Sequence, residues 1–593
     1  MKRILISRGW QGRVLEAGGT LCALLLLGML IGGGTARAND IYLAQNAAGA
    51  NNGSCCANAF PYSFFNAAGN WGGAANQIGP GTTVHLCSVI ADSLNGTLLT
   101  AHGSGASGNP VTIQFESGAS LLSPGEAAFI NGGNFSHFVI TGRTTCGWVN
   151  GAEVPCMESI YNTLNGYAGQ TCPGGPCVDQ VQTQVINNFN SDLEVRNLTI
   201  GPVYIHGGTS DTTFSAPGPK CVDFTTGGGT MNFHNLIMHD VGWCLNGGGN
   251  LITVANVEIY HFDHGMGMGQ YTDSPNTWTG ITVHDSYLHD PGVWDQANNA
   301  FHHDGIHLFS YCATSADFCP STKITGVNIY NNRFGGDWGN NNTANIFFEP
   351  GISNANIFNN VTVVYPGRQL NNGQWNGYGT NVNFFNNTVL GPGAAYQTEK
   401  YSIFTGFGIT IENNVWTDGG MISTNGPWPG VNCPYTIPPA EGGGTQPCVN
   451  LNYTLKTNAY LSAVGFANGL GYTNCTGSSC AGNGFLNFTS TDFAVFEASA
   501  HETGGVFGDT VEPNGTYFNA STGATTYGSP TIAAGTNLTS LCTSLGISGN
   551  PCLGDIAGTP RPSSGAWDIG AYQFSSGPNS PPSPPTSLGG SVQ

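Results

Sequence analysis

Short stretches that alternate apolar and polar residues, each closed by an asparagine or an aspartate, recur along the middle of the chain. Three successive copies read NIYNNRF, NIFNNVT and NFFNNTV. The residues that close the stretches are, in order, Asn197, Asn235, Asn256, Asp285, Asn331, Asn359, Asn386 and Asn413. Five of the seven intervals between them are 21 to 29 residues long, and the other two are 38 and 46 residues.

This repeat is typical of a solenoid in which one coil holds three short strands and three turns. Each strand hydrogen-bonds to the strands about 4.8 Å above and below it, and inward apolar residues stack into one core. Asparagine suits the turn because it tolerates positive φ and can hydrogen-bond to the asparagine of the next coil. A β-propeller blade needs about 40–45 residues, and a sandwich would not show this steady period. The pattern therefore predicts an all-β parallel β-helix, in which the two long intervals are coils with an inserted loop.

Residues 1–38 have the features of a secretory signal peptide. Four basic residues precede a compact apolar run at 21–31, which is shorter than the roughly 20 residues that span a bilayer. Ala36-Arg37-Ala38 offers a cleavage site, and an uncleaved membrane anchor is the alternative. No later stretch is long and apolar enough to cross a membrane, so we expect a secreted protein, extracellular or at the cell surface.

Charge narrows the possible partners. Removal of residues 1–38 takes away five of the 14 basic and one of the 34 acidic residues, which leaves a formal charge of −24. Such a chain has no basic face for phosphate groups, so nucleic acid is excluded as a partner. A polyanionic sugar would be repelled unless metal ions bridge it, whereas a neutral glycan meets no such barrier. We expect a monomer whose partner is an extracellular polysaccharide.

Cysteine is frequent, with 18 in the chain and 17 after cleavage. In a secreted chain these cysteines predict disulfides. The pairs expected from closeness in sequence are Cys146/Cys156, Cys172/Cys177, Cys312/Cys319, Cys433/Cys448, Cys475/Cys480 and Cys542/Cys552. Looser pairings are Cys221 with Cys244, and Cys87 with either Cys55 or Cys56. The odd number leaves one thiol over, and without paired CxxC motifs a structural zinc site is not indicated.

Both ends of the chain resemble secreted right-handed parallel β-helix proteins of the pectate-lyase-like class. A strand at 41–44, a polar loop and the turn PGTTV resemble the first coil of that class, where PGDTV is frequent. The motifs SPTIAAG and GDIAGTPRPSSGAWDIGAYQF resemble its closing segments, although Ala533 and Gln573 stand where Asp and Glu are usual. The resemblance implies a right-handed parallel β-helix and does not reach a specific enzyme family.

The expected organisation has five parts. They are a signal peptide at 1–38, an N-terminal cap with the first coils at 39–110, the parallel β-helix with loop inserts at 111–430, a less regular C-terminal extension or cap at 431–575, and a Pro/Ser-rich tail at 576–593.

Residues 281–311 concentrate titratable side chains in a chain of which only 8% is charged. When the coils are aligned at their turn residues, two rows of such residues are expected on successive coils. The first row runs through His239-Asp240, Tyr260-His261, His289-Asp290 and Gly335-Gly336. The second row runs through Asp263-His264-Gly265, His303-Asp304-Gly305 and Ala344-Asn345, with His307 and Glu349 on the same strand or at its end.

Asp304, His303 and His264 are the leading candidates for catalysis, as general acid, general base or metal ligand. His307, four residues after His303, is a further candidate for a shared metal or sugar contact. Arg333 is also a catalytic candidate, because polysaccharide lyases of the resembled fold use Arg or Lys as the base. The structural alternatives are a turn-capping Asp304 and an Arg333 paired with an acid at the edge of a rung.

For substrate binding we expect Trp294 and Trp338 to offer sugar-stacking platforms. His289, Asp290 and Glu349 are the expected polar contacts. The alternative for the tryptophans is packing, and for His289 and Asp290 it is a structural ladder in which the aspartate orients the histidine.

Carboxylates on adjacent rungs lie about 5 Å apart, and two rungs apart about 10 Å. These separations suit the two carboxylates of a glycosidase, and they equally suit Ca²⁺, for which Asp263, Asp290 and Asp304 would be the ligands. The sequence thus predicts a polysaccharide lyase or glycoside hydrolase, with Ca²⁺ as the candidate cofactor. The competing hypothesis is a non-catalytic cell-surface, adhesion or glycan-binding solenoid in which the two rows are polar ladders.

Overall fold

In the computed structural model the chain is described from residue 40 to residue 575 with internal gaps. The gaps are 92–96, 124–127, 164–170, 173–174, 177–183, 204–218, 225–228, 271–276, 295–301, 311–321, 340–341, 350, 364–373, 378, 391–395, 399–407, 418–421, 425–434, 438–443, 447–452, 463–501, 510 and 513–514.

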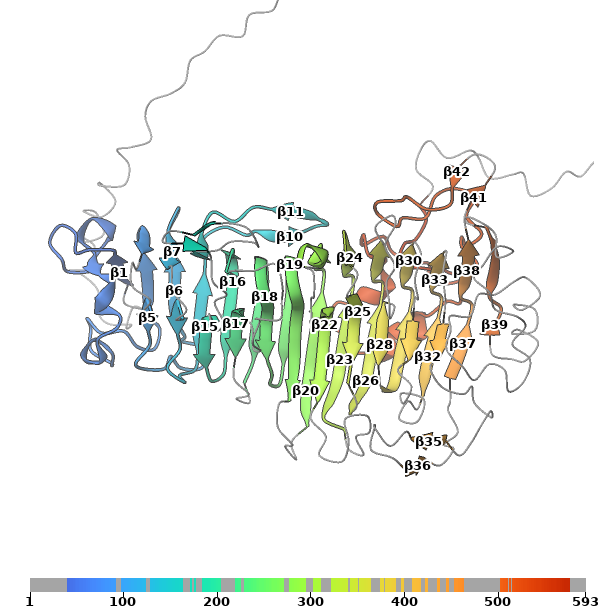
Figure 1. Cartoon of the computed structure of the whole chain (residues 1–593), viewed down its shortest axis with the longest axis horizontal. Helices are drawn as coiled ribbons and strands as arrows, with labels where there is room; N and C mark the ends of the chain where they lie inside the picture. Colours follow the sequence, from blue (N-terminus) through green and yellow to red (C-terminus); the bar gives the residue numbers. More distant parts are fainter. Residues whose placement is uncertain are drawn as a thin grey trace, which may run out of the picture.

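Nearly every described strand pairs in parallel with strands of the coils before and after it (Figure 1). The coils stack along one long axis, from β1 at the N-terminal end towards β39 and β40 at the other. Each regular coil contributes one strand to each of three sheets. The predicted parallel β-helix is therefore confirmed.

The first sheet contains the strand that leads into each predicted asparagine turn. Its strands are β1 (Asp40–Ala44), β3 (Thr83–Leu86), β6 (Val111–Phe115), β9 (Phe138–Thr141), β16 (Leu193–Ile200), β18 (Met231–Gly247), β19 (Ile252–Gln270), β20 (Trp278–His284), β23 (Ile324–Tyr330), β26 (Ile352–Phe358), β29 (Thr380–Phe385), β32 (Ile409–Glu412), β37 (Tyr453–Lys456) and β39 (Glu502–Thr503).

The second sheet follows the turn. Its strands are β4 (Val89–Ala91), β7 (Ser120–Ser123), β12 (Ser159–Asn162), β21 (Tyr287–His289), β24 (Arg333–Gly335), β27 (Val361–Val363), β30 (Thr388–Leu390), β33 (Val415–Thr417), β38 (Ala459–Ser462) and β40 (Val506–Asp509).

The third sheet completes each coil. Its strands are β5 (Leu99–Thr100), β8 (Ile130–Asn131), β15 (Gln184–Phe189), β17 (Lys220–Phe224), β22 (His303–Ser310), β25 (Asn342–Phe348), β28 (Trp375–Gly377), β31 (Tyr396–Thr398) and β34 (Ile422–Thr424). The long strands β18 and β19 bend through the turns without a break, so they take part in all three sheets, and β16 takes part in the first two.

Four short antiparallel hairpins and a few short helices lie outside the coils. The hairpins are β10 (Gly147–Val149) with β11 (Ala152–Val154), β13 (Thr171–Cys172) with β14 (Gly175–Pro176), β35 (Tyr435–Ile437) with β36 (Gly444–Gln446), and β41 (Val511–Glu512) with β42 (Gly515–Thr516). The helices are η2 (Cys56–Asn58), η3 (Tyr62–Phe64), η4 (Ala68–Asn70), η6 (Pro291–Trp294), α4 (Thr539–Ser544) and η10 (Pro551–Leu553), and β2 (Phe60–Pro61) pairs with β1. Among the described residues, no helix has the length and apolar character needed to cross a membrane.

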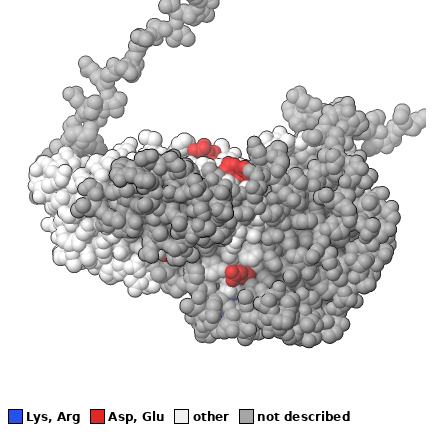
Figure 2. Space-filling view, in the orientation of Figure 1, with Lys and Arg blue, Asp and Glu red and all other residues white. Residues whose placement is uncertain are grey.

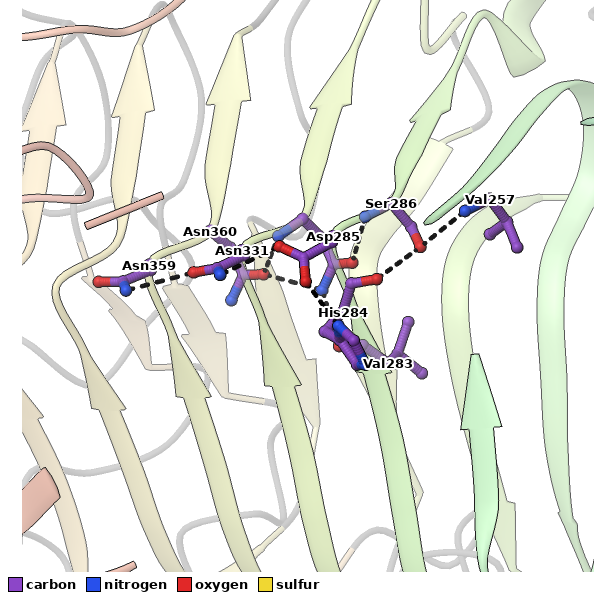
Figure 3. A network of polar contacts seen from close by, with 9 residues as sticks. Val257, Val283, His284, Asp285, Ser286, Asn331, Asn359 and Asn360 are labelled. Atoms are coloured by element: carbon purple, nitrogen blue, oxygen red, sulfur yellow. Dashed lines mark hydrogen bonds and ion pairs between the residues drawn. The ribbon is translucent and has the colours of Figure 1, made fainter. Parts of the chain in front are cut away.

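All eight predicted turn residues adopt the left-handed conformation. Their φ angles lie between 51° and 59°, a range that asparagine and aspartate tolerate better than other non-glycine residues. The turn side chains also hydrogen-bond from coil to coil, as Asn331 Nδ2 does to Asp285 Oδ1 and Asn359 Nδ2 does to Asn331 Oδ1 (Figure 3). The predicted left-handed conformation is thus confirmed at all eight turns, and the predicted hydrogen bonds between turn side chains are present from Asp285 through Asn331 to Asn359.

A second asparagine ladder runs just inside the first. From the turn at Asn331 onward, the residue after the turn is a fully buried asparagine, and its side-chain N–H donates to the amide oxygen of the asparagine one coil further on, at 3.0–3.1 Å. The members are Asn332, Asn360, Asn387, Asn414 and Asn458. Because every buried donor and acceptor along the line is used, the ladder costs little desolvation energy and fixes the register of the coils.

Apolar side chains stack in the same way to form the core. One column of inward residues passes through seven coils in strict register: Val254, Val283, Ile329, Ile357, Phe384, Ile411 and Leu455. All belong to one continuous buried cluster. Continuous burial of this kind is the main stabilising contribution to a solenoid, since each coil contacts only its neighbours.

The C-terminal segment packs along the side of the late coils, where Figure 1 draws it in orange and red. Leu538 and Trp567 cover a stack of Tyr330, Phe358 and Phe385 on the outer face of the first sheet. Buried Arg561 donates to Asn359 Oδ1 and to a backbone carbonyl of the segment itself. The closing motifs of the sequence therefore bind the segment to the coils.

Three of the predicted disulfides are present: Cys146–Cys156, Cys542–Cys552 and, of the two options for Cys87, Cys56–Cys87. The predicted pair Cys221/Cys244 is wrong, because both residues are buried in the core as thiols, and burial raises the pKa of Cys244. Each of the other four predicted pairs has at least one cysteine outside the described residues.

Replacement of Asn387 by alanine tests the buried ladder. The variant removes the oxygen that accepts from the Asn360 backbone N–H and from one Asn360 side-chain N–H, and it removes the side-chain donor to Ile357 O. Because buried unpaired polar groups cost about 1–3 kcal/mol each, we expect a loss of about 3 kcal/mol in unfolding free energy, measured by urea denaturation. Asn383→Ala on the outer face of the same coil, where the amide is only partly buried, is the matched control and should cost less than about 1 kcal/mol. Equal losses would contradict the structural role of the ladder.

Candidate functional site

The two predicted rows of histidine and aspartate exist. In the first, His239 pairs in register with Tyr260, Tyr260 with His289, and His289 with Gly335. In the second, His264 of β19 pairs with Asp304 of β22, and Asp304 pairs with Ala344 of β25. Residues forty positions apart thus become neighbours, because the third sheet stacks one coil on the next.

The centre of the second row is the carboxylate of Asp304, which is completely buried. Three imidazole nitrogens surround its Oδ2 atom: His302 Nε2 at 3.2 Å, His264 Nε2 at 3.4 Å and His307 Nδ1 at 3.4 Å. The opposite nitrogen of His307 lies 3.2 Å from Glu349 Oε1. We call these five residues the His/Asp cluster.

The surroundings hold the cluster in place. Thr343 donates its hydroxyl to Asp304 Oδ1, the oxygen that faces away from the imidazoles. The ring of Trp243 stacks on His264 one coil earlier, with ring centres 4.1 Å apart. Beside the cluster, buried His303 contacts the carboxylate of Asp263 at 3.1 Å. His303 is therefore adjacent to the cluster but directed at a different carboxylate.

Electrostatics within the cluster follow from these contacts. Burial alone raises the pKa of Asp304, but the imidazoles of His264, His302 and His307 outweigh it and hold that pKa well below its usual range. Contact with Asp304 raises the pKa of His302. Burial lowers the pKa of His264, despite the nearby carboxylate. Asp304 therefore stays ionised at neutral pH and cannot itself supply a proton.

Exposure decides which members a solvent-borne molecule can reach. The His302 side chain is 53% exposed and that of Glu349 is 33% exposed, whereas Asp304 is inaccessible. Sequence reasoning missed His302 as a site residue. The signal was present, since it is the first histidine of HHDG, but it precedes the strand and so lies outside the aligned rows.

The first row forms a separate structural ladder. His289 stacks between Tyr260 and Tyr287, and its two nitrogens contact Asp290 and Glu258. Burial lowers the pKa of His289, but the two carboxylates raise it by a larger amount, so the net shift of the pKa is upward. Asp290 also accepts from the backbone N–H of Asp337 on the next coil, at 2.7 Å. These contacts favour the ladder alternative over substrate binding for His289 and Asp290.

Two other predicted site residues have packing roles. Trp338 is buried in the core, where its indole N–H donates to Gly335 O, so the prediction of a sugar-stacking platform is wrong. Arg333 donates to Tyr572 and to Thr522 O of the C-terminal segment, so its contacts are structural, although its partners are a hydroxyl and a carbonyl and not the acid of the predicted alternative. The side chain of Trp294 lies outside the described part of the structure.

The candidate calcium ligands are not gathered at one point. Asp290 belongs to the first row, and Asp263 contacts His303. Among the described residues, the group whose ligand atoms converge is His264, His302 and Asp304, with all three atoms within 4.8 Å of one another. Ca²⁺ prefers six to eight oxygen ligands, so a set with two imidazoles does not suit it.

Comparisons with known proteins add no family. No protein-family model and no curated protein matches the chain. Among solved structures, the chain is similar to the GH136 lacto-N-biosidase from Eubacterium ramulus, with 13% identity over 72% of this chain and 64% of that one, at a TM-score of 0.37. It is also similar to the A-module of the Azotobacter vinelandii mannuronan C-5 epimerase AlgE6, with 14% identity over 58% of this chain and 87% of that one, at a TM-score of 0.20.

Both of these neighbours are carbohydrate-active enzymes by name, but likenesses at TM-scores below 0.5 carry no argument. The chain spans less than two thirds of the lacto-N-biosidase's length. The assignment of the fold therefore stands on the strand pairing described above.

The raised pKa of His302 can be measured by NMR titration of its ring protons in chelator-treated protein. We expect Asp304→Asn to lower the pKa of His302, because the variant removes the negative charge that stabilises the imidazolium. Glu349→Gln is the control and should leave the His302 titration unchanged, since Glu349 contacts His307. An unchanged His302 pKa in Asp304→Asn would contradict the contact.

The contact between Asp304 and His302 also makes the unfolding free energy depend on pH. Asp304 has a lowered folded pKa, so its contribution is complete above the unfolded value of about 3.9 and is lost as pH falls through the folded value. His302 has a raised folded pKa, so its contribution is complete below about 6.5 and is lost as pH rises through the folded value. In urea denaturation, Asp304→Asn should therefore be most destabilising between about pH 5 and 6 and less so at alkaline pH.

Proposed function

We propose that this protein is secreted and cleaves an extracellular polysaccharide at the His/Asp cluster. The observation that carries the proposal is the buried, ionised Asp304 ringed by three imidazoles, of which one is half-exposed. Burying a carboxylate costs free energy unless charged partners compensate for it. Buried clusters with shifted pKa values are frequent at catalytic sites.

Charge favours a neutral glycan as the substrate. The full chain has a formal charge of −20, which falls to −24 without residues 1–38. On the face drawn in Figure 2, acidic side chains form separate spots on a largely uncharged described surface. A uronate polymer would be repelled by this chain, whereas a neutral polysaccharide would not.

Hydrolysis fits the cluster better than elimination. Polysaccharide lyases of the resembled fold use Arg or Lys as the base, and the described cluster contains neither. Arg333, the candidate lyase base, is engaged with the C-terminal segment. His302 and Glu349 are the groups that a glycosidic bond can approach from solvent, and Asp304 acts through the imidazoles that it positions.

The disulfide bonds support secretion. The described residues include three disulfides, a type of bond that persists in oxidising compartments and is rare in the cytosol. The signal peptide expected at residues 1–38 lies outside the described residues and accords with the same location.

Glycan binding without turnover is the second candidate function. A polar pocket on the outer face of the early coils favours it, because its lining can hydrogen-bond to sugar hydroxyls. The lining residues are Gln114, Thr141, Gly142, Arg143, Thr145, Arg196, Asn197, His234 and Asn235. In this case the His/Asp cluster would have a structural or metal-binding role.

A panel of neutral and acidic polysaccharides separates the two functions. We expect the secreted chain to release reducing ends from a neutral polysaccharide, and Asp304→Asn and His302→Ala each to lower the rate at least about 100-fold. His137→Ala is the matched control, because His137 also lies 3.3 Å from a carboxylate, that of Asp192, but outside the cluster. Unsaturated products from a uronate polymer would instead indicate a lyase, and binding without any product would favour the binding function.

A further inference from the structure

The distances within the His/Asp cluster match the separations between ligand atoms of a metal site. Metal-bound imidazole nitrogens and carboxylate oxygens lie about 2.0–2.2 Å from Zn²⁺, so two such atoms on a tetrahedral ion are about 3.4 Å apart. Asp304 Oδ2 lies 3.4 Å from His264 Nε2 and 3.2 Å from His302 Nε2. The usual N–H···O hydrogen bond is shorter, at about 2.9–3.0 Å.

Two atoms at the centre of the cluster are also without hydrogen bonds. In the described part of the chain, Asp304 Oδ2 and His307 Nδ1 are buried and have no hydrogen-bond partner. Buried polar atoms in native proteins are nearly always paired, with protein, water or an ion. A fully buried carboxylate oxygen that faces three imidazole nitrogens at 3.2–3.4 Å is the arrangement expected where a cation binds between them.

We propose that His264, His302 and Asp304 bind one divalent transition-metal ion of the zinc type. Two imidazoles and one carboxylate make the three-ligand set typical of metal sites that keep an open coordination position. His307, whose Nδ1 lies 3.4 Å from Asp304 Oδ2, stands next to that position. Imidazole ligands select transition metals, so Ca²⁺ and Mg²⁺ are disfavoured.

The residues behind these ligands form the support that metal sites require. Thr343 binds the second oxygen of Asp304 and so orients the carboxylate. Trp243 stacks on His264 and fixes the plane of its ring. Glu349 contacts the outer nitrogen of His307, which is the carboxylate–histidine arrangement seen behind metal ligands.

The site is open to ions from solvent. His302 is half-exposed, while the other two ligands lie on regular strands whose register the coils fix. One ligand at the surface and two on rigid strands give a preformed site with access for the metal. An ion there would face the surface from which a glycan approaches, where it could polarise a bound water or sugar oxygen.

Metal binding can be tested without any glycan. The tag-free secreted chain is stripped with EDTA, dialysed and titrated with ZnCl₂ by calorimetry, and Co²⁺ is used to record the absorption of a tetrahedral site. We expect one Zn²⁺ per chain, unaffected by excess Ca²⁺. His302→Ala should weaken binding at least about 100-fold and His307→Ala about 10-fold. His302 is half-exposed, so its removal leaves the fold intact.

His137→Ala, which removes a histidine beside Asp192 elsewhere on the surface, should bind zinc as the unmodified chain does. Absence of stoichiometric binding by the unmodified chain, or equal binding by His302→Ala, would overturn the proposal. So would an equal loss in His137→Ala. Since the readout is metal content, the site can be present when no polysaccharide is cleaved, and the two proposals fail separately.

Discussion

The parallel hydrogen bonds between successive coils are the constraint on which the rest of the structure depends. They fix the register of each strand against the next, so that His264 of one coil always faces Asp304 of the following coil. A slip by one residue would move each of these side chains to the other face of the sheet. The turns oppose such a slip, because a left-handed residue recurs at the same point of each coil, joined from Asn332 onward by a buried asparagine amide.

This regularity allows an unfavourable group to be buried. Asp304 lies in a chain of low charge, where an isolated carboxylate would be protonated or would unfold its surroundings. Imidazoles from two coils offset that cost, and the hydroxyl of Thr343 from a third coil completes the site. The remaining free energy needed to hold the cluster comes from the coil-to-coil hydrogen bonds and from the apolar core, which begins two residues along the same strands at Met266 and Ile306.

Much of this arrangement can be predicted from the sequence, because the repeat gives the number of residues between equivalent positions on successive coils. The eight turn residues and the pairing of His264 with Asp304 depend only on residue counting between coils. The roles of Arg333 and Trp338 could not be predicted in this way. Arg333 meets Tyr572, which lies 239 residues further on, and Trp338 turns inward because Gly335 O accepts from its indole. His302 lies in the loop before a strand. Loop length varies from coil to coil, so the repeat does not show which residues His302 faces.

A double-mutant cycle between His264 and Asp304 tests most directly whether stacked coils bring these residues into contact. Unfolding free energies of His264→Gln, Asp304→Asn and the double variant are measured by urea denaturation in the presence of a chelator. The structure predicts a coupling of at least about 0.5 kcal/mol, as expected for residues in contact. Changes that add to within about 0.3 kcal/mol, as for distant residues, would contradict the stacking and the cluster built on it.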